Sequence, residues 1–411
     1  MVKYSKIHHT LSVCLSLIPL SLVLGAAVLE LFIILSCFLF FFLNYKKIAL
    51  EYYKNKFFLI FSLFYFFLVT SSILSEHIMH SLKNTFFYFR FGIITLSVWY
   101  LLENFKKFKL IFFYLTLITF IILIFYSFIE IFILKNYSDP YRISGIFGSE
   151  SIQGSFLLRV TPILMILYFY NRESIKQVYH NFFYLILIFI LILILLSGER
   201  AAIFLMIVFL LLSLLFLKIR FTKILVLTTL FISIFLATLW LYPKAYERIV
   251  LKTYNEFFDK NLHTQKIYLF SKGHEQHALS ALKMFKNNYI KGVGVRNFRM
   301  ECQKEDYLKL GEYYCTTHPH NTYMQLLSET GLVGFLFFVF FLFFIFCESL
   351  KYLNKIYLKN EKLNIPLGII FSIILTNFFP LASTGSFFNN WLSAIYFLPL
   401  PFLLYEIKYF K

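Results

Sequence analysis

Long apolar runs are the feature that most constrains how this 411-residue chain can fold. Runs of roughly 20 residues, the length of a helix that crosses a bilayer, recur along most of the sequence, as at 57–74, 110–134 and 224–241. The strands of a membrane barrel would be about half as long and would alternate in polarity. Because 60% of the residues are hydrophobic and only 15% are charged, the sequence predicts an all-α polytopic membrane protein.

About twelve membrane helices are expected. They are expected at 11–24, 27–43, 57–74, 86–102, 110–134, 155–170, 182–196, 201–217, 224–241, 332–346, 367–379 and 391–404. The first two are separated at Gly25. We therefore expect nine membrane helices within 1–241, a large loop at 242–331 between helices 9 and 10, and three further helices within 332–411.

Lysine and arginine indicate the expected cytoplasmic side. They are much more frequent in one set of short connections, such as 46–56, 106–109 and 351–362, than in the opposite set. Short cytoplasmic loops are enriched in these residues. Both termini are therefore expected in the cytoplasm and the 242–331 loop outside, in the periplasm of a Gram-negative cell. The net charge of +18 is explained in the same way, without nucleic acid as a partner.

The expected outer loop is the only part with the composition of a soluble protein. Within it, 275–286 is predicted to form an amphipathic helix, with Ala278, Leu279, Leu282 and Phe285 on its apolar face. About ninety residues are few for an independent domain. We expect a cap that packs on the outer ends of the membrane helices.

Two cysteines, Cys302 and Cys315, lie in this loop. A disulfide between them fits an oxidising compartment, and closing such a loop would stabilise the fold by about 3 kcal/mol. Free thiols and a metal site shared with histidines are the alternatives, although the spacing lacks the paired pattern of zinc sites. Cys14, Cys37 and Cys347 fall in membrane helices and are interpreted as small apolar residues.

The segment 292–334 is the densest polar stretch of the chain. His318, His320 and Asn321 lie just before the helix at its end. A histidine there can act as a general base near neutral pH, and a solvated or capping histidine is the alternative. Asn321 can also be a helix N-cap. Glu329 is interpreted either as an acid or as a solvated charge at the membrane edge.

Arginines gather at the expected outer ends of helices. The candidates for substrate binding are Arg142, Arg159, Arg200, Arg296 and Arg299. Arginine at the edge of a membrane helix is costly unless it is paired or faces water, and its guanidinium group binds phosphate bidentately. An anionic, pyrophosphate-linked lipid would suit such a set. The alternative is pairing with an acid, for example Arg200 with Glu199 or Glu150.

Several motifs together resemble the O-antigen ligase and polymerase superfamily. They are RISGIFGSESIQGSFL at 142–157, SGER at 197–200, GxGxxxF at 292–298, His320-Asn321 followed by Tyr323, ExGLxG at 329–334 and PLASTGSFFNNW at 380–391. The resemblance covers nearly the whole chain, including the large loop between helices 9 and 10.

The resemblance implies a GT-C-type glycosyltransferase of the bacterial inner membrane that takes a glycan from undecaprenyl diphosphate and needs no metal or other cofactor. The acceptor would be lipid A-core for a ligase, another lipid-linked glycan for a polymerase, or a protein. His320, with His318 beside it, matches the motif histidine, and Arg200 matches the arginine after a turn between helices. A second arginine of the family falls on His274 here, so His274 or Arg299 is expected to supply that contact.

The mechanism expected from the resemblance begins when His320 takes the proton of an acceptor hydroxyl group. Arg200, with Arg142 or Arg299, would stabilise the departing diphosphate. A lipid-linked glycan transporter is the alternative of a different class, and it predicts an internal repeat and contacts at the membrane midplane. We see no repeat, and the polar residues collect at one face. A transporter is therefore disfavoured, and within the superfamily a ligase is favoured because the loop motif and the plan of membrane helices suit it.

Overall fold

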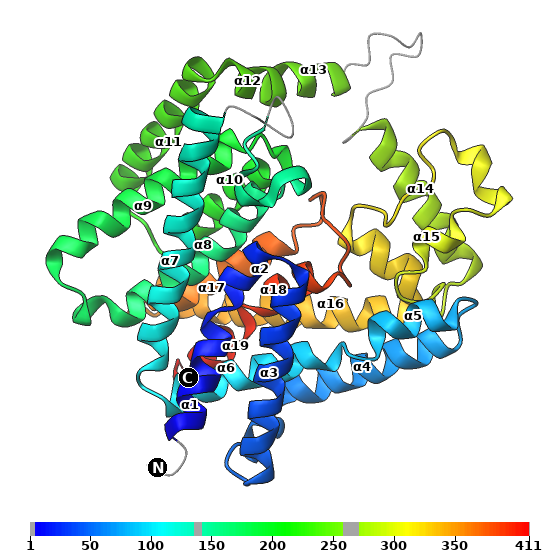
Figure 1. Ribbon diagram of the computed structural model, residues 1–411, viewed down its shortest axis with the longest axis horizontal. Coiled ribbons are helices and arrows are strands. Elements are labelled where there is room, and N and C mark those ends of the chain that lie inside the picture. Colours follow the sequence, from blue (N-terminus) through cyan, green and yellow to red (C-terminus); the bar gives the residue numbers. More distant parts are fainter. Residues whose placement is uncertain (1–4, 135–141, 258–270, 411) are drawn as a thin grey trace.

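The computed structural model describes residues 5–134, 142–257 and 271–410 (Figure 1). The helices are α1 (Ser5–Ser16), α2 (Ile18–Leu24), α3 (Ala26–Tyr45), α4 (Lys56–Ile73), α5 (Ile78–Thr85), α6 (Phe89–Asn104), α7 (Phe108–Ile129), α8 (Gln153–Asn171), α9 (Gln177–Leu196), α10 (Arg200–Phe216), α11 (Phe221–Leu241), α12 (Pro243–Tyr246), α13 (Lys252–Phe257), α14 (Lys272–Asn287), α15 (Phe298–Glu301), α16 (Thr322–Tyr357), α17 (Ile365–Asn377), α18 (Asn390–Phe397) and α19 (Leu400–Tyr409). Short helical turns are η2 (Leu50–Tyr53), η3 (Glu130–Leu134), η4 (Gly145–Glu150), η5 (Arg172–Ser174), η6 (Glu247–Leu251) and η7 (Glu305–Leu310).

Every expected membrane helix falls on a helical segment of the structure. Within the described residues, 8 helices are long and apolar enough to cross a membrane, and the bent pair α1–α2 makes up to 9. Helices α10 and α17 are apolar but shorter, and α18 and α19 together replace the last expected helix. The all-α membrane class is confirmed, whereas the number of crossings and the side on which the loop lies stay predictions.

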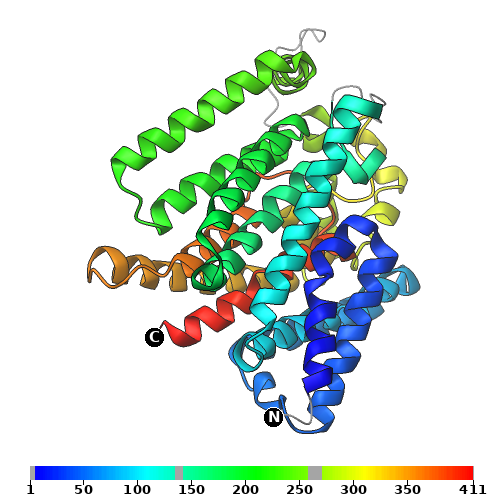
Figure 2. The same cartoon turned by 60° about the vertical axis from the view of Figure 1, so that its left-hand side comes forward.

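The helices differ greatly in how far they are enclosed by protein. The apolar windows of α8 and of the α5–α6 segment are 72% and 83% buried, whereas that of α11 is only 6% buried. Figure 2 shows α11 lying apart from the central bundle. In the bundle, Arg90 is buried on α6, and its guanidinium donates to Glu30 at 3.1 Å and to Asn390 at 2.7 Å. Pairing therefore offsets the cost of an arginine within a membrane helix.

A small cap follows α13 in the chain and packs against the first turns of α16. In Figure 1, α14 and α15 lie together at the right of the view, beside α5 and α16. The cap has its own apolar core, which includes Met284, Phe298 and Tyr307. Residues 258–270 of the expected outer loop lie outside the described residues.

The amphipathic helix predicted at 275–286 is present as α14, but its predicted face is buried only in part, because Ala278, Leu282 and Phe285 are half-buried and Leu279 is exposed. The structure buries Ala281 and Met284, whereas Leu279 is 43% exposed. The helix packs against α15 and α16. The residues that this packing buries are therefore not the ones that the apolar spacing alone indicates. The elements on which α14 packs therefore decide which of its faces is buried, and the spacing of its apolar residues alone does not.

Candidate active site at the N-terminus of α16

The backbone of the glycine motif at 292–294 packs closely against the backbone of the glycine motif at 331–334, and we call this contact the glycine crossing. Gly292 and Gly331 have φ angles of +70° and +62°, which favour glycine. A Cβ on Gly331 would lie 2.4 Å from the carbonyl oxygen of Ile290. The Val293 N–H donates to the Ser328 carbonyl at 3.0 Å. The loop before α15 is therefore laid directly on the first turns of α16, where that helix kinks at Gly331.

Glu329 is the buried centre of this crossing. Its side chain is fully buried, and its carboxylate accepts from the backbone N–H groups of Arg296 at 2.9 Å and Phe298 at 3.4 Å. It also accepts from Nε2 of Gln325 at 3.0 Å. The alternative of a solvated charge at the membrane edge is therefore wrong, because the helix and the loop enclose the carboxylate on both sides.

Asn321 begins α16 and holds a second loop against it. Its Oδ1 accepts from backbone N–H groups of the first turn at 3.0 and 3.1 Å, as expected of an N-cap. Its Nδ2 donates to the Pro380 carbonyl at 2.8 Å, and the Thr384 N–H donates to the His320 carbonyl at 2.9 Å. The segment 380–389 is thereby fixed beside the histidines, although it is about 60 residues away in the chain.

Four imidazole rings gather at this point. His274 and His277 come from α14, and their ring centroids lie 5.5 and 5.3 Å from that of His320. The His318 ring is 4.2 Å from the His320 ring. Sequence reasoning missed His277, although it lies three residues after His274 on a predicted helix and so shares its face. In the described part of the chain, no group of three or more histidine, cysteine, aspartate or glutamate side chains is arranged to hold a metal ion.

The surroundings keep His277, His318 and His320 neutral. Burial, together with the neighbouring His318, His274 and His277 rings, lowers the pKa of His320 to about 3. Burial also lowers the pKa of His318 and of His277 to about 4. His318 and His274 are held by the Thr384 carbonyl at 3.3 Å and the Ser383 hydroxyl at 3.0 Å.

The His320 ring is a candidate general base of the site. Among the described residues its side chain has no hydrogen-bond partner, and it is only partly buried. Its backbone has φ of +54°, so the ring is placed by a turn that few residues adopt. A neutral, accessible imidazole in such a position can accept a proton.

Three of the predicted arginines have a buried N–H donor that is not used in a hydrogen bond among the described residues. Within the described residues, the buried Nε atoms of Arg159, Arg296 and Arg299 have no hydrogen-bond partner, and neither has Nδ1 of His277. Arg296 and Arg299 are near enough for their charge to act on His318. Arg159 interacts electrostatically with Tyr396. Buried donors of this kind are normally satisfied, so an anionic group that accepts from them would complete the site.

Tyr396, on which the charge of Arg159 acts, also contacts the start of α16 beside residues 318–321, which we call the histidine loop. The Tyr396 hydroxyl lies 3.3 Å from the Thr322 hydroxyl, which lies 3.1 Å from that of Thr384. Thr322 is the first residue of α16, two positions after His320. A short chain of polar contacts thus joins Tyr396 of α18 to the start of α16 and to Thr384.

Arg142 has a different environment. It donates to the Ser197 carbonyl at 3.3 Å and to the Ser151 carbonyl at 2.7 Å. The Glu199 carboxylate accepts from the Gly154 N–H and the Ser155 hydroxyl at 2.6 and 2.7 Å. Arg142 and Glu199 therefore tie the 142–157 loop to the turn that starts α10.

Arg200 is the first residue of α10 and donates to the Thr253 hydroxyl at 3.3 Å. Phe204, one turn further along α10, packs on Phe379 with ring centroids 5.5 Å apart. Phe379 precedes Pro380, the residue held by Asn321. The N-terminus of α10 is thus tied to the histidine loop through this segment.

A disulfide joins Cys302 and Cys315. It connects the end of α15, which carries Arg299, to the segment that leads into His318. Replacing both cysteines by serine is expected to lower the stability of the cap by about 3 kcal/mol, because the bridge limits the unfolded chain. Limited proteolysis of the purified protein should then cut the cap faster. Cys347→Ser is the control, since that cysteine is unbridged, and equal protease resistance of the double variant would contradict the expectation.

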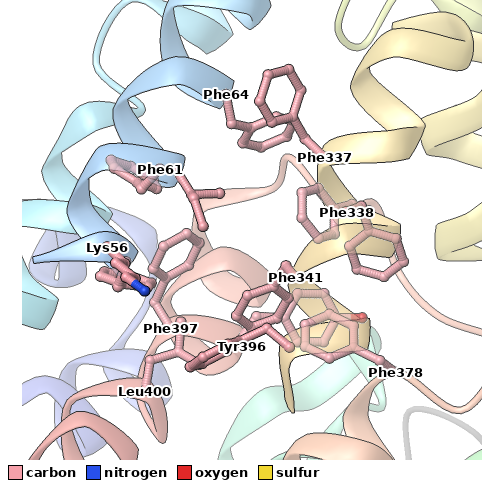
Figure 3. Close-up of a pocket in the computed structure, with 14 residues that line it drawn as sticks. Lys56, Phe61, Phe64, Phe337, Phe338, Phe341, Phe378, Tyr396, Phe397 and Leu400 are labelled. Atoms are coloured by element: carbon pink, nitrogen blue, oxygen red, sulfur yellow. The ribbon is translucent and has the colours of Figure 1, made fainter. Parts of the chain in front are cut away.

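An aromatic cleft lies between α4, α16 and α18–α19. Figure 3 shows Phe61 and Phe64 of α4 facing Phe337, Phe338 and Phe341 of α16. The Phe338 ring packs on Tyr323 at 5.3 Å, three residues after His320. One end of the cleft is therefore adjacent to the histidine loop.

Comparison with protein families gives one match. Residues 185–339 match the family model described as Wzy_C, O-Antigen ligase. The matched segment contains the four histidines, Arg200, Arg296, Arg299 and the glycine crossing. No curated protein matches the chain. The family match confirms the resemblance found in the sequence.

Proposed function

We propose that this chain, which belongs to the O-antigen ligase and polymerase superfamily, transfers a glycan from undecaprenyl diphosphate to a hydroxyl group of an acceptor. The observation that carries the proposal is the set of unsatisfied donors beside the histidines. Arg159, Arg296 and Arg299 each have a buried Nε atom without a partner among the described residues. Guanidinium groups bind phosphate oxygens well, and a diphosphate offers several.

The chemistry proposed for the site needs a base and a stabilised leaving group. His320 takes the proton of the acceptor hydroxyl, and the hydroxyl oxygen forms a bond to the anomeric carbon of the donor sugar. The bond from that carbon to the diphosphate oxygen breaks, and the diphosphate leaves with the electron pair. Arg299 and Arg159 stabilise its growing charge. No step of this scheme uses a metal ion.

The remaining predicted residues are assigned supporting roles. His318 and His274 keep the base neutral and in place, and Arg296 adds positive charge at the same side. Arg200 contributes to the diphosphate site from the first turn of α10, where the helix dipole also favours an anion. Arg142 holds the loops that carry this turn, because it donates hydrogen bonds to the backbone carbonyls of Ser197 and Ser151.

The aromatic cleft is proposed to hold the first isoprene units of the donor's tail. It is lined almost entirely by apolar side chains, and Phe387 and Tyr396 bring its wall to the polar contacts around Thr322. A diphosphate bound by the arginines would thus have an apolar path leading away from it (Figure 3). The donor is a polyprenyl lipid on this argument, and a soluble sugar nucleotide would leave the cleft empty.

A ligase that uses lipid A-core as acceptor is the form we favour, in the inner membrane with the site at the periplasmic face. A glycolipid gel of cells that lack the gene, with and without the wild-type copy, tests this. Loss of all long-chain material, with polymer left on the carrier, is the expected result. Collapse of the ladder to core plus one repeat would indicate a polymerase. An unchanged ladder would contradict both and direct attention to protein glycosylation or transport.

The pH dependence of transfer should reflect the lowered pKa values. An ordinary histidine base would become protonated, and therefore inactive, as the pH falls through about 6.5. Because burial and the neighbouring rings lower the pKa of His320 to about 3, kcat/KM should be retained at pH 5.5 and fall only at lower pH. His277→Phe removes one neighbouring ring and should move this fall toward higher pH. A wild-type midpoint at or above 6.5 would contradict the assignment.

A further inference from the structure

A second concavity lies at the other end of α16 from the histidines. It lies between α4, α16 and α19. It shares Lys56, Phe57 and Phe344 with the aromatic cleft, and Figure 3 shows Lys56 at the edge of that cleft. We call it the lysine pocket after the lysines that line it, which are Lys54, Lys56, Lys351, Lys355 and Lys408.

The charge of the lysine pocket is only partly balanced. Lys351 pairs with Glu348 at 2.6 Å, and Lys408 pairs with Glu103 at 2.8 Å. Lys355 pairs with Glu361 at 3.4 Å. Lys54 and Lys56 have no acidic partner among the residues that the structure describes, so an excess of positive charge remains.

The walls of the lysine pocket are largely apolar. Trp99, Phe371, Leu404 and Ile407 line it between the lysines. Outside it, the neighbouring surfaces of α4 and α16 are also apolar, with Leu59 61% exposed on α4 and further phenylalanines exposed on α16. Lysine stems pack along such surfaces while their ammonium groups stay at the membrane edge. A ligand that fits both features is an amphiphile with an anionic head.

We propose that the lysine pocket binds the headgroup of an anionic phospholipid, whose acyl chains lie along α4 and α16. Lysines at a membrane edge are common on the cytoplasmic side. These differ because three segments far apart in the sequence, at 54–56, 351–355 and 408, bring them into one concavity. A free phosphate ion would use the lysines but not the apolar walls. The proposal does not rest on the glycan-transfer assignment.

The test compares lipid binding by the purified full chain and its variants in mild detergent. Intact-protein mass spectrometry would count the molecules of phosphatidylglycerol or phosphatidylcholine that stay bound. Lys54→Gln with Lys56→Gln removes the two unbalanced charges without leaving an acid unpaired, and phosphatidylglycerol should bind about tenfold or more weakly. Lys106→Gln with Lys107→Gln is the matched control, since these exposed lysines lie outside the pocket.

Lys54→Arg with Lys56→Arg keeps the charge and should retain phosphatidylglycerol. Equal retention by the glutamine variant and the wild type would overturn the proposal. So would equal retention of phosphatidylcholine, because the headgroup charge would then not matter. Displacement of the bound lipid by millimolar inorganic phosphate would overturn it as well, since the site would then recognise a soluble anion.

Discussion

Replacing His320 by glycine is expected to reduce glycan transfer by about 10²- to 10⁴-fold, the usual contribution of a general base, while leaving the protein at least as stable as the wild type. In the proposed scheme, the partly buried imidazole of His320 takes the acceptor's proton. The backbone of His320 has φ of +54°. Glycine adopts this conformation without strain, so the substitution removes the ring and relieves the turn. Transfer would be measured with membranes that contain equal amounts of each variant.

Asparagine at position 320 gives an independent check, because it also tolerates a positive φ but cannot act as a base. His320→Asn should match His320→Gly in activity. His180→Asn is the control, since His180 contacts Tyr168 on the far side of the bundle. A His320→Gly protein that is folded and still transfers glycan would show that another group is the base, and loss of folded protein would show that the ring has a structural role.

The positions of the membrane helices were readable from the sequence because they depend on local properties. The run at 224–241 became α11 at Phe221–Leu241, and the glycine at position 25 separates α2 from α3. Length, polarity and caps decide such elements, and each is visible within a window of about 20 residues. The prediction of the buried face of α14 was only partly right for the converse reason. That face is set by packing against α15 and α16, which follow α14 in the chain and lie outside its local sequence window.

The candidate site was only partly readable for the same reason. His318, His320 and Asn321 share one short segment and could be singled out together. His277 joins them only because the cap folds α14 onto α16, and Arg159 acts on Tyr396 of α18 only because the bundle brings the two side chains near each other. The motif at 380–391 could be identified in the sequence. Its hydrogen bonds to the histidine loop could not be predicted, because they form only when the chain folds back toward the start of α16 after α17.

Replacing Glu329 by glutamine is expected to destabilise the cap by about 2–5 kcal/mol, since buried groups left unsatisfied cost about 1–3 kcal/mol each. The carboxylate accepts from two backbone N–H groups and from Gln325. A glutamine offers one acceptor oxygen and turns its NH₂ group toward another donor. Faster proteolysis of the cap and a lower thermal unfolding temperature are the expected measurements. Glu312→Gln is the control, because that side chain is 75% exposed on the same cap.

The same substitution separates a structural role for Glu329 from a catalytic one. If Glu329 were an acid of the reaction, Glu329→Gln would fold normally and be inactive. If it is the centre of the crossing, exchanging the pair in Glu329→Gln with Gln325→Glu should recover part of the lost stability, because a carboxylate at 325 can accept from the new amide and still accept from the Phe387 N–H. Recovery of stability would also return part of the transfer activity, since His320 is positioned from the helix that begins beside this pair. The motifs around Gly292, Glu329 and Gly331 would then have the structural role of positioning the base, and His320 would be the base itself.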